Sequence, residues 1–483
     1  MKKLTLYIAF VLLTTLAALA QSPKREFRGA WLHTVFQTQY LRNTTAQNKE
    51  YICRQLDSLA AMGVNAVIFQ VRPQADAFYA SRLEPWSCYL TADGKAPRPF
   101  WDPLEFIIGE AHARGMELHA WLNPYRVTSN TRQIQKLPSS HIYRKHPERF
   151  VNYGGKLYFD PALPENREFI GKVVDDIVAR YDIDGIHFDD YFYPYPIAGK
   201  DFPDGKSYAR YGAGMKRADW RRHNVDLLIE DIHRRIAKAK PWVRFGISPF
   251  GIYRNKSTHP AGSDTRGLEN YDALYADVLL WAQKGWVDYL MPQLYWETDH
   301  KSASYLVLVD WWDKATDGSR HIYVGQDVER SVKKAELGRK VALSRKAERI
   351  QGNCWWPGYS LTRNVGGVAD SLSTALQRTP ALVPSYPWIC TDAPKPVSRI
   401  IPSDARTFSW EGGKVAGDVS DIVKYAVYRF ESRRDIDCEK AEALVAVTYG
   451  NTFTAKEAGI YVVTALNRAN IESTPSAPIY INE

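Results

Sequence analysis

The sequence predicts an α/β protein: a TIM-type (β/α)8 barrel followed by a small all-β sandwich domain. Short apolar runs alternate with helical patterns along the first four fifths of the chain, and polar or aromatic residues follow each run. This alternation is typical of parallel strands joined by helices. Eight runs suffice to close a barrel. They lie at residues 27–34, 66–72, 117–123, 185–190, 244–249, 289–295, 322–326 and 352–356.

The helical segments between these runs carry their own start and stop signals. The stretch DPLEFIIGEAHARG offers Asp102 as an N-cap, Pro103 as the first helical residue and Gly115 as a terminator. Apolar residues recur at helical spacing over 170–181 and 225–236. Two further helices are therefore predicted to pack their apolar faces on the barrel.

The N-terminus reads as a secretory signal. Met1, Lys2 and Lys3 precede an apolar run, and a small-residue site follows that predicts cleavage after Ala20. No cysteine stands at the cleavage point, so a lipid anchor is disfavoured. We expect an exported protein without a membrane span, located in the periplasm, outside the cell or at the cell envelope.

A proline-rich stretch, VPSYPWICTDAPKP, separates the barrel from the tail. We predict a signal peptide at 1–20, the barrel at 21–385, a linker at 386–396 and a β-sandwich at 397–483. The tail segments YAVYRF and YVVTALNRANIES resemble a fibronectin type III module, which implies a spacing or binding role.

Composition excludes several classes of function. Lys and Arg exceed Asp and Glu by 9, but they are scattered and no nucleic-acid motif accompanies them. The five cysteines are widely spread, without zinc-site or disulfide-scaffold spacing. No phosphate-binding or dinucleotide fingerprint occurs. We expect no metal, no cofactor and no nucleic-acid partner; the sequence does not predict the oligomeric state.

The fourth predicted strand carries the clearest chemistry, DGIHFDDYFYP. Strand side chains alternate, so His187 and Asp189 share one face and Asp190 lies on the other. Asp189 is expected to point inward, with Asp190 joining the site if the chain turns directly after it. The alternative is an ordinary cap or salt bridge, although packing alone does not explain two acids at the end of a buried strand, because buried acids are costly without partners.

The sixth strand, DYLMPQLYWE, ends at Glu297 and offers a second carboxylate. Glycoside hydrolysis uses one protonated and one ionised carboxyl group. Asp189, Asp190 and Glu297 are therefore the predicted catalytic residues. The alternative for Glu297 is a solvated side chain or a pair with a neighbouring base.

Other strand ends supply the mixture of aromatic and polar groups that binds sugars. Each alone has a structural alternative: an internal ion pair for an arginine, a core position for a histidine. The predicted glycan-binding residues are His33, Gln70, Arg72, Asn123, Tyr125, Arg126, His187, Tyr191, Tyr193, Gln293, Tyr295, Trp296, Asp327 and Trp355.

Six motifs in order, FRGAWLHT, GVNAVIFQVRP, HAWLNPYR, DGIHFDDYFYP, ISPFGIYRN and YLMPQLYWE, resemble the glycosyl hydrolase-like family 10 proteins. The resemblance implies a TIM barrel at the cell envelope acting on polysaccharide such as peptidoglycan glycan, including strands without stem peptides. The fourth motif is also similar to the family 18 chitinase signature, but Tyr191 stands where that signature ends in its catalytic Glu. Asp189 or Asp190 would then have to donate the proton.

Two functions remain open from the sequence. The first is a hydrolase of N-acetylated β-linked envelope glycan, with one Asp of the pair as general acid and Glu297 as base or nucleophile. The second is a non-catalytic glycan-binding protein that uses the same residues. A metal-dependent deacetylase ranks third, because the sequence offers no three-ligand cluster.

Overall fold

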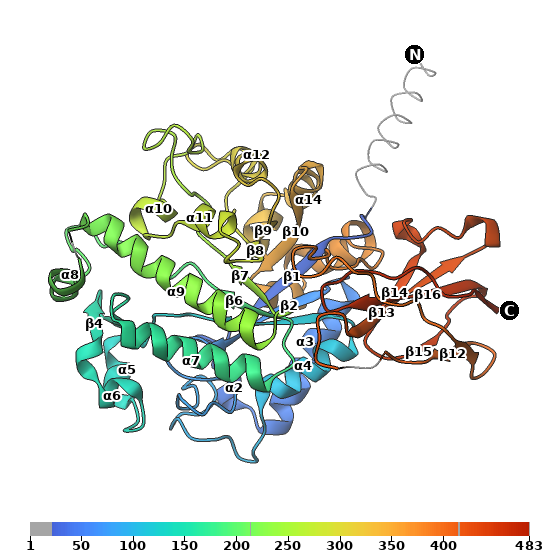
Figure 1. Ribbon diagram of the computed structural model, residues 1–483, viewed down its shortest axis with the longest axis horizontal. Helices are drawn as coiled ribbons and strands as arrows, with labels where there is room; N and C mark the ends of the chain where they lie inside the picture. Colours follow the sequence, from blue (N-terminus) through green and yellow to red (C-terminus); the bar gives the residue numbers. More distant parts are fainter. Residues whose placement is uncertain (1–21, 213, 414–415, 483) are drawn as a thin grey trace.

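The computed structural model describes residues 22–212, 214–413 and 416–482 (Figure 1). The predicted signal peptide, 1–20, lies outside the described residues. Within those ranges, no helix combines the length and the apolar character that crossing a bilayer requires.

Eight parallel strands close into a barrel in the order β1-β10-β9-β8-β7-β6-β3-β2, which confirms the predicted fold class. The strands are β1 (Phe27–Leu32), β2 (Ala66–Arg72), β3 (Glu117–Leu122), β6 (Gly185–Phe188), β7 (Arg244–Ile247), β8 (Tyr289–Leu290), β9 (His321–Asp327) and β10 (Ile350–Trp356). Five of them, β1, β3, β6, β7 and β8, end earlier than predicted. Pro249 and Pro292 follow β7 and β8 and cannot donate to the ladder, and isolated bridges such as Phe250–Gln293 continue the pairing beyond them.

Helices surround the barrel (Figure 1). The longer ones are α3 (Thr45–Ala61), α4 (Pro103–Ala113), α7 (Pro164–Arg180), α9 (Arg217–Ala239), α12 (Tyr305–Ala315) and α14 (Leu337–Lys346). The shorter ones are α2 (Gln39–Arg42), α5 (Thr131–Lys136), α6 (Ile142–Lys145), α8 (Gly205–Tyr211), α10 (Asn270–Ala273), α11 (Val278–Gln283), α13 (Val328–Lys333), α15 (Gly358–Thr362) and α16 (Val368–Ser371). Asp102 caps α4 as predicted, accepting from the backbone N–H groups of Leu104 and Glu105.

Side-chain alternation divides the barrel core into two layers. Inward residues such as Phe27, Trp31, Tyr289 and Tyr323 fill the barrel itself. The other face of each strand packs against the helices in a larger apolar cluster. Besides these rings the barrel interior contains the buried histidines His119 and His187, and further polar side chains lie near the strand ends.

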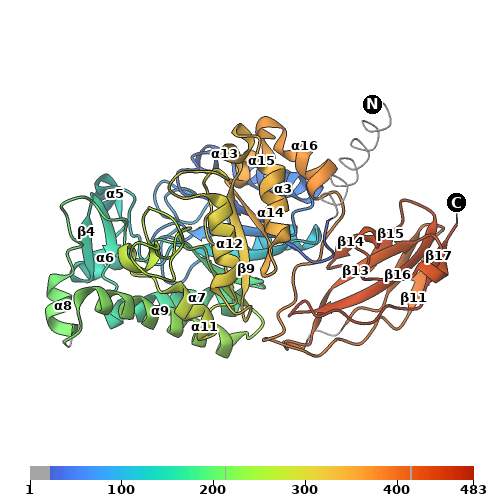
Figure 2. The ribbon, with the colours of Figure 1, turned by 90° about the horizontal axis from the view of Figure 1, so that it is seen from above.

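The tail forms two antiparallel sheets, which confirms its predicted all-β class (Figure 2). One sheet contains β11 (Ile400–Pro402), β12 (Thr407–Trp410) and β15 (Thr452–Thr454). The other contains β14 (Leu444–Thr448), β13 (Ile422–Phe430), β16 (Gly459–Asn467) and β17 (Ile479–Ile481). A separate hairpin of β4 (Phe150–Tyr153) and β5 (Lys156–Phe159) lies between β3 and α7 along the chain and was not predicted.

The tail docks on the amino-terminal end of the barrel through a buried charge cluster. Glu117, at the start of β3, accepts from Lys424 Nζ at 2.7 Å and from Asn470 Nδ2 at 3.0 Å, and Arg244 Nη2 lies 2.5 Å from its second oxygen. The proline-rich segment before the tail also packs here. Tyr386 is fully buried and its hydroxyl lies 2.9 Å from that of Tyr323. The segment predicted as a linker thus closes the base of the barrel.

Candidate active site

Two adjacent aspartates lie at the carboxyl end of the barrel, where β6 stops at Phe188. Asp189 and Asp190 are 3% and 2% exposed. In a barrel of this type the strand ends and the loops that follow them form the site. The groups that hold this pair come from the ends of β3 and β8 and from the loop after β6.

Asp189 points into the barrel, as its place in the strand predicts. Asn123 Nδ2 donates to both of its oxygens, at 3.0 and 3.1 Å, and Trp121 Nε1 donates to Oδ2 at 3.1 Å. Both donors belong to the inward face of the β3 segment. Asp189 is therefore held in one orientation by two side chains from the neighbouring strand.

Asp190 joins the site because the chain turns directly after it. The backbone N–H of Phe192 donates to the Asp190 carbonyl at 3.1 Å, which closes the turn. Gln293 Nε2 donates to Asp190 Oδ1 at 3.1 Å, and the Tyr195 hydroxyl donates to Oδ2. Gln293 also donates to the carbonyl of Ser248 at 3.0 Å, which fixes its amide between two strand ends.

Burial changes the acidity of both carboxyl groups. Burial, together with the neighbouring charge of Asp190, raises the pKa of Asp189 to about 6 against the opposing effects of Arg126 and of the hydrogen bonds from Trp121 and Asn123. Burial also raises the pKa of Asp190, against the hydrogen bonds from Tyr195 and Gln293. With its pKa near 6, Asp189 retains its proton in mildly acidic solution.

A buried hydrogen-bonded chain runs below the pair along the barrel axis. Burial lowers the pKa of His187 well below its usual value, so its ring is neutral. Trp31 Nε1 donates to His187 Nε2 at 3.2 Å, which leaves the proton on Nδ1, 3.0 Å from the Tyr289 hydroxyl. The Tyr289 hydroxyl lies 2.9 Å from His119 Nδ1, and His119 Nε2 lies 3.3 Å from Glu117 Oε2. His187 therefore supports the site from beneath and does not line it.

Aromatic rings surround the pair at the rim of the barrel. Tyr191 and Tyr195 stack with ring centroids 5.4 Å apart, and the Arg126 guanidinium lies 5.3 Å from the Tyr191 ring. Across the barrel, Trp356 packs against Trp121 with centroids 6.1 Å apart. Exposed aromatic faces beside hydrogen-bonding groups are suited to the C–H faces and hydroxyls of sugars.

Several predicted residues also lie at this end of the barrel. Asn123 and Gln293 bind the carboxylates, and Arg126, Tyr191, Tyr295 and Trp296 are placed around them. His33 lies on the opposite side of the rim, with its ring 4.8 Å from that of Trp356. Asp327 caps α13 through the backbone N–H of Arg330 and is half-buried.

Glu297 is not in contact with the aspartates. Its carboxylate lies 3.8 Å from Lys334 Nζ, and no hydrogen bond or ion pair joins it to Asp189 or Asp190 among the described residues. The ladder of β8 ends at Leu290 and isolated bridges at Gln293 continue it, so Glu297 lies beyond the last paired residue of this segment. The structure pairs Glu297 with a base, which is the alternative named from the sequence, and its catalytic role stays a prediction.

Other predicted binding residues are buried away from the rim. Arg72 donates to Glu84 at 2.6 and 2.7 Å and to the carbonyl of Asn123 at 2.5 Å, so its guanidinium is used internally. Gln70 accepts from the backbone N–H groups of Thr34 and Val35, both at 3.0 Å. The remaining buried members of the predicted set are Tyr125, Tyr193 and Trp355.

The alternation of side chains along β10 determines which of Trp355 and Trp356 faces the barrel interior. Cys354 faces the barrel interior, so Trp356 shares its face and Trp355 points toward the helices. Trp356, rather than the predicted Trp355, therefore faces the barrel interior. Tyr195, which donates to Asp190, was not among the predicted residues, although the run YFYPYP directly after the two acids was its signal.

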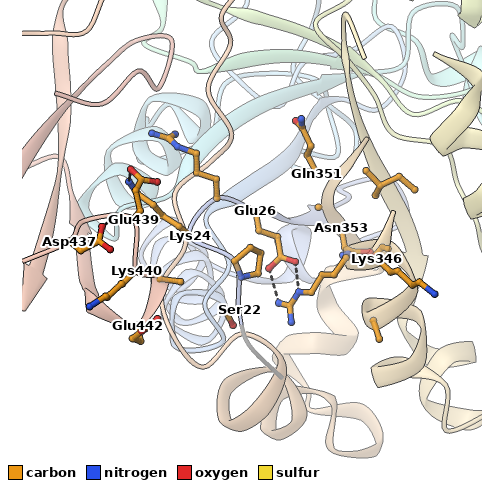
Figure 3. Close-up of a pocket in the computed structure, with 18 residues that line it drawn as sticks. Ser22, Lys24, Glu26, Lys346, Gln351, Asn353, Asp437, Glu439, Lys440 and Glu442 are labelled. Carbon is orange, nitrogen blue, oxygen red and sulfur yellow. Dashed lines mark hydrogen bonds and ion pairs between the residues drawn. The ribbon is translucent and has the colours of Figure 1, made fainter. Parts of the chain in front are cut away.

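A cavity of about 840 Å³ lies at the other end of the barrel, against the tail (Figure 3). Some of its charged side chains pair: Arg345 donates to both oxygens of Glu26, and Lys24 pairs with Glu439. Asp437 and Glu442 also line this cavity, on the side of the tail. Among the residues that the structure describes, no three His, Cys, Asp or Glu side chains form a metal-binding group.

Known proteins resemble this chain over most of its length. Residues 26–340 match the family described as glycosyl hydrolase-like 10. The glycosyl hydrolase YngK of Bacillus subtilis (strain 168) is 40% identical, over 97% of this chain and 95% of YngK. The glycosyl hydrolase DigH of Escherichia coli (strain K12) is 38% identical, over 64% of this chain and 74% of DigH. The solved PgaB (BpsB) glycoside hydrolase domain from Bordetella bronchiseptica covers 72% of this chain and 98% of its own at 13% identity, with a TM-score of 0.49.

Proposed function

We propose, since this chain belongs to the glycosyl hydrolase-like 10 family, that it hydrolyses the glycosidic bonds of an N-acetylated β-linked glycan of the bacterial envelope, such as peptidoglycan without stem peptides. The observation that carries the proposal is the pair of buried, adjacent carboxyl groups at the carboxyl end of β6. Their surroundings supply what the reaction needs: a proton held near neutral pH and a neighbouring negative charge.

The protonated member of the pair gives its proton to the glycosidic oxygen as the bond to the anomeric carbon breaks. The ionised member stabilises the positive charge that develops on the sugar. In an N-acetylated sugar, the carbonyl oxygen of the substrate's own acetamide can attack the anomeric carbon, and water then completes hydrolysis. This route needs no carboxylate at the position of Glu297.

Release of glycan fragments tests the proposal. Peptidoglycan with and without stem peptides is incubated with the native protein and with the Asp189→Asn and Asp190→Asn variants, and products are identified by mass spectrometry. We expect the native protein to release fragments from the stripped glycan and each variant to be slower by about 100-fold or more. Glu297→Gln is the matched control and should keep the native rate.

The result that overturns the proposal is equally definite. If the native protein binds the glycan and releases nothing, the glycan-binding function takes its place. If Glu297→Gln is as inactive as the aspartate variants, the assignment of the pair is wrong.

The finer assignments outside the barrel belong to the same proposal. We infer that the chain is exported after cleavage at Ala20, on the strength of its N-terminal pattern. The tail would be a fibronectin type III-like module, supported by the motifs noted above. N-terminal sequencing of the protein recovered outside the cytoplasm should begin at Gln21; recovery of the uncleaved chain from the cytoplasm would contradict export.

A further inference from the structure

We propose that the barrel holds a glycan strand on both sides of the aspartate pair and therefore cuts it internally. This inference rests on the proposed function and adds two separate binding surfaces for sugar rings. The near arm consists of Tyr191, Tyr195 and Trp296, and the far arm of His33, Phe36 and Trp356. The juxtaposition of the two arms across the pair carries the argument.

The strand order places the arms opposite each other. In the closed barrel β10 lies directly across from β6, and β1 directly across from β7. The near arm follows β6 and β8, whereas the far arm follows β1 and ends β10. Trp121 lies between them, because it donates to Asp189 and packs against Trp356. A strand that crosses the barrel end from one arm to the other must pass over the pair.

The near arm continues directly from the catalytic carboxylates. Tyr191 and Tyr195 are 36% and 38% exposed although they flank two buried acids. Tyr195 also contacts Phe250, which packs against Trp296 with ring centroids 5.5 Å apart. The arm thus forms a continuous aromatic surface over the ends of three neighbouring strands.

Phe36 is the most informative residue of the far arm. Its side chain is 66% exposed and its backbone φ is 64°, a left-handed conformation that disfavours bulky residues. Side-chain contacts fix the turn on both sides of Phe36. The Gln70 side-chain oxygen accepts from the backbone N–H groups of Thr34 and Val35. Gln37 Nε2 lies 2.6 Å from His33 Nε2. A residue held in this way, with its ring largely in solvent, contributes little to folding and is suited to contact a ligand.

The experiment measures affinity rather than turnover. An Asp190→Asn background prevents hydrolysis, and β-linked N-acetylglucosamine oligomers are titrated by calorimetry. Phe36→Ala should weaken binding of the hexasaccharide about three- to tenfold and leave the disaccharide unchanged. Phe36→Asn should behave alike, because Asn tolerates the left-handed backbone and separates loss of the ring from misfolding.

Phe100→Ala is the matched control. Phe100 is also 66% exposed and packs against Trp86 in the loop between β2 and α4, and it belongs to neither arm. Its loss should change neither affinity. The first products that the native protein releases from the hexasaccharide should come from internal bonds.

Unchanged hexasaccharide affinity in both Phe36 variants overturns the inference, as does release of single terminal sugars from the start. These failures differ from failure of the proposed function. If the aspartate variants lose hydrolysis but the Phe36 variants bind normally, the proposed hydrolase function is retained and the far arm is rejected as a binding surface. If the native protein hydrolyses nothing but the Phe36 variants bind the hexasaccharide weakly, the far arm is retained as a binding surface and the hydrolase function is rejected.

Discussion

Replacing Asp189 by Asn is expected to abolish activity and yet to stabilise the protein in alkaline solution. Burial raises the pKa of Asp189 from 3.8 to about 6. The folded state therefore binds the proton more tightly than the unfolded chain, and the free energy of unfolding decreases as pH rises from about 4 through about 6. The difference between the two pKa values corresponds to about 3 kcal/mol lost at pH 8.

Asparagine is neutral at every pH and removes this cost. The N–H groups of the new side-chain amide would face Asn123 Nδ2, which donates to Asp189 in the native protein. This mismatch should lower the free energy of unfolding by about 1 kcal/mol. We therefore expect Asp189→Asn to gain about 1–2 kcal/mol in free energy of unfolding at pH 8 and to lose about 1 kcal/mol at pH 4. Urea unfolding followed by tryptophan fluorescence at both pH values measures the change.

Asp184, just before the same strand, provides a control of opposite sign. Burial alone would raise its pKa, but the His112 ring at 2.8 Å and the charge of Arg244 hold that pKa below its usual value. Its contribution to stability is present above the unfolded pKa and is lost as pH falls, so Asp184→Asn should destabilise the protein at pH 8. The reasoning is refuted if both variants lose stability at pH 8.

Three further predictions concern the ion pairs and the pH profile. Lys424→Met leaves Glu117 buried with fewer partners and should lower the free energy of unfolding by about 2–4 kcal/mol in thermal or urea unfolding, whereas Met at the exposed Lys456 should have no effect. Arg72→Met strands the buried Glu84 carboxylate and should cost about 3–5 kcal/mol, which an added Glu84→Leu change should largely restore. Hydrolysis of a soluble glycan should decline above about pH 6 as the aspartate pair loses its proton, and kcat/KM independent of pH from 4 to 9 would contradict this assignment.

The barrel could be predicted because each strand combines an apolar run with a following polar group, and each helix carries its own periodicity. The α4 cap at Asp102 and the inward direction of Asp189 follow from local rules alone. The early end of β8 was harder to foresee, since Pro292 breaks the ladder inside an otherwise strand-like run. The β4–β5 hairpin was missed because four-residue strands leave too short a pattern to recognise.

The candidate site was predicted only in part because its geometry depends on tertiary contacts. Arg72 was predicted to bind sugar from its residue type and its position at a strand end, whereas in the folded chain its guanidinium forms an ion pair with Glu84. Glu297 ends a strand-like run, but the ladder of β8 stops at Leu290, so its position beside Lys334 could not be predicted from the sequence. Phe36 gave no signal in sequence, because its exposure and backbone conformation appear only in the folded chain.

The most direct measurement is a crystal structure of the Asp190→Asn variant with a bound N-acetylated hexasaccharide. The account predicts a glycosidic oxygen within hydrogen-bond distance, about 3 Å, of the side chain at position 189 or 190, with sugar rings on the aromatic residues to both sides. A hexasaccharide bound only in the cavity beside Glu26 and Arg345, at the opposite end of the barrel, would contradict it.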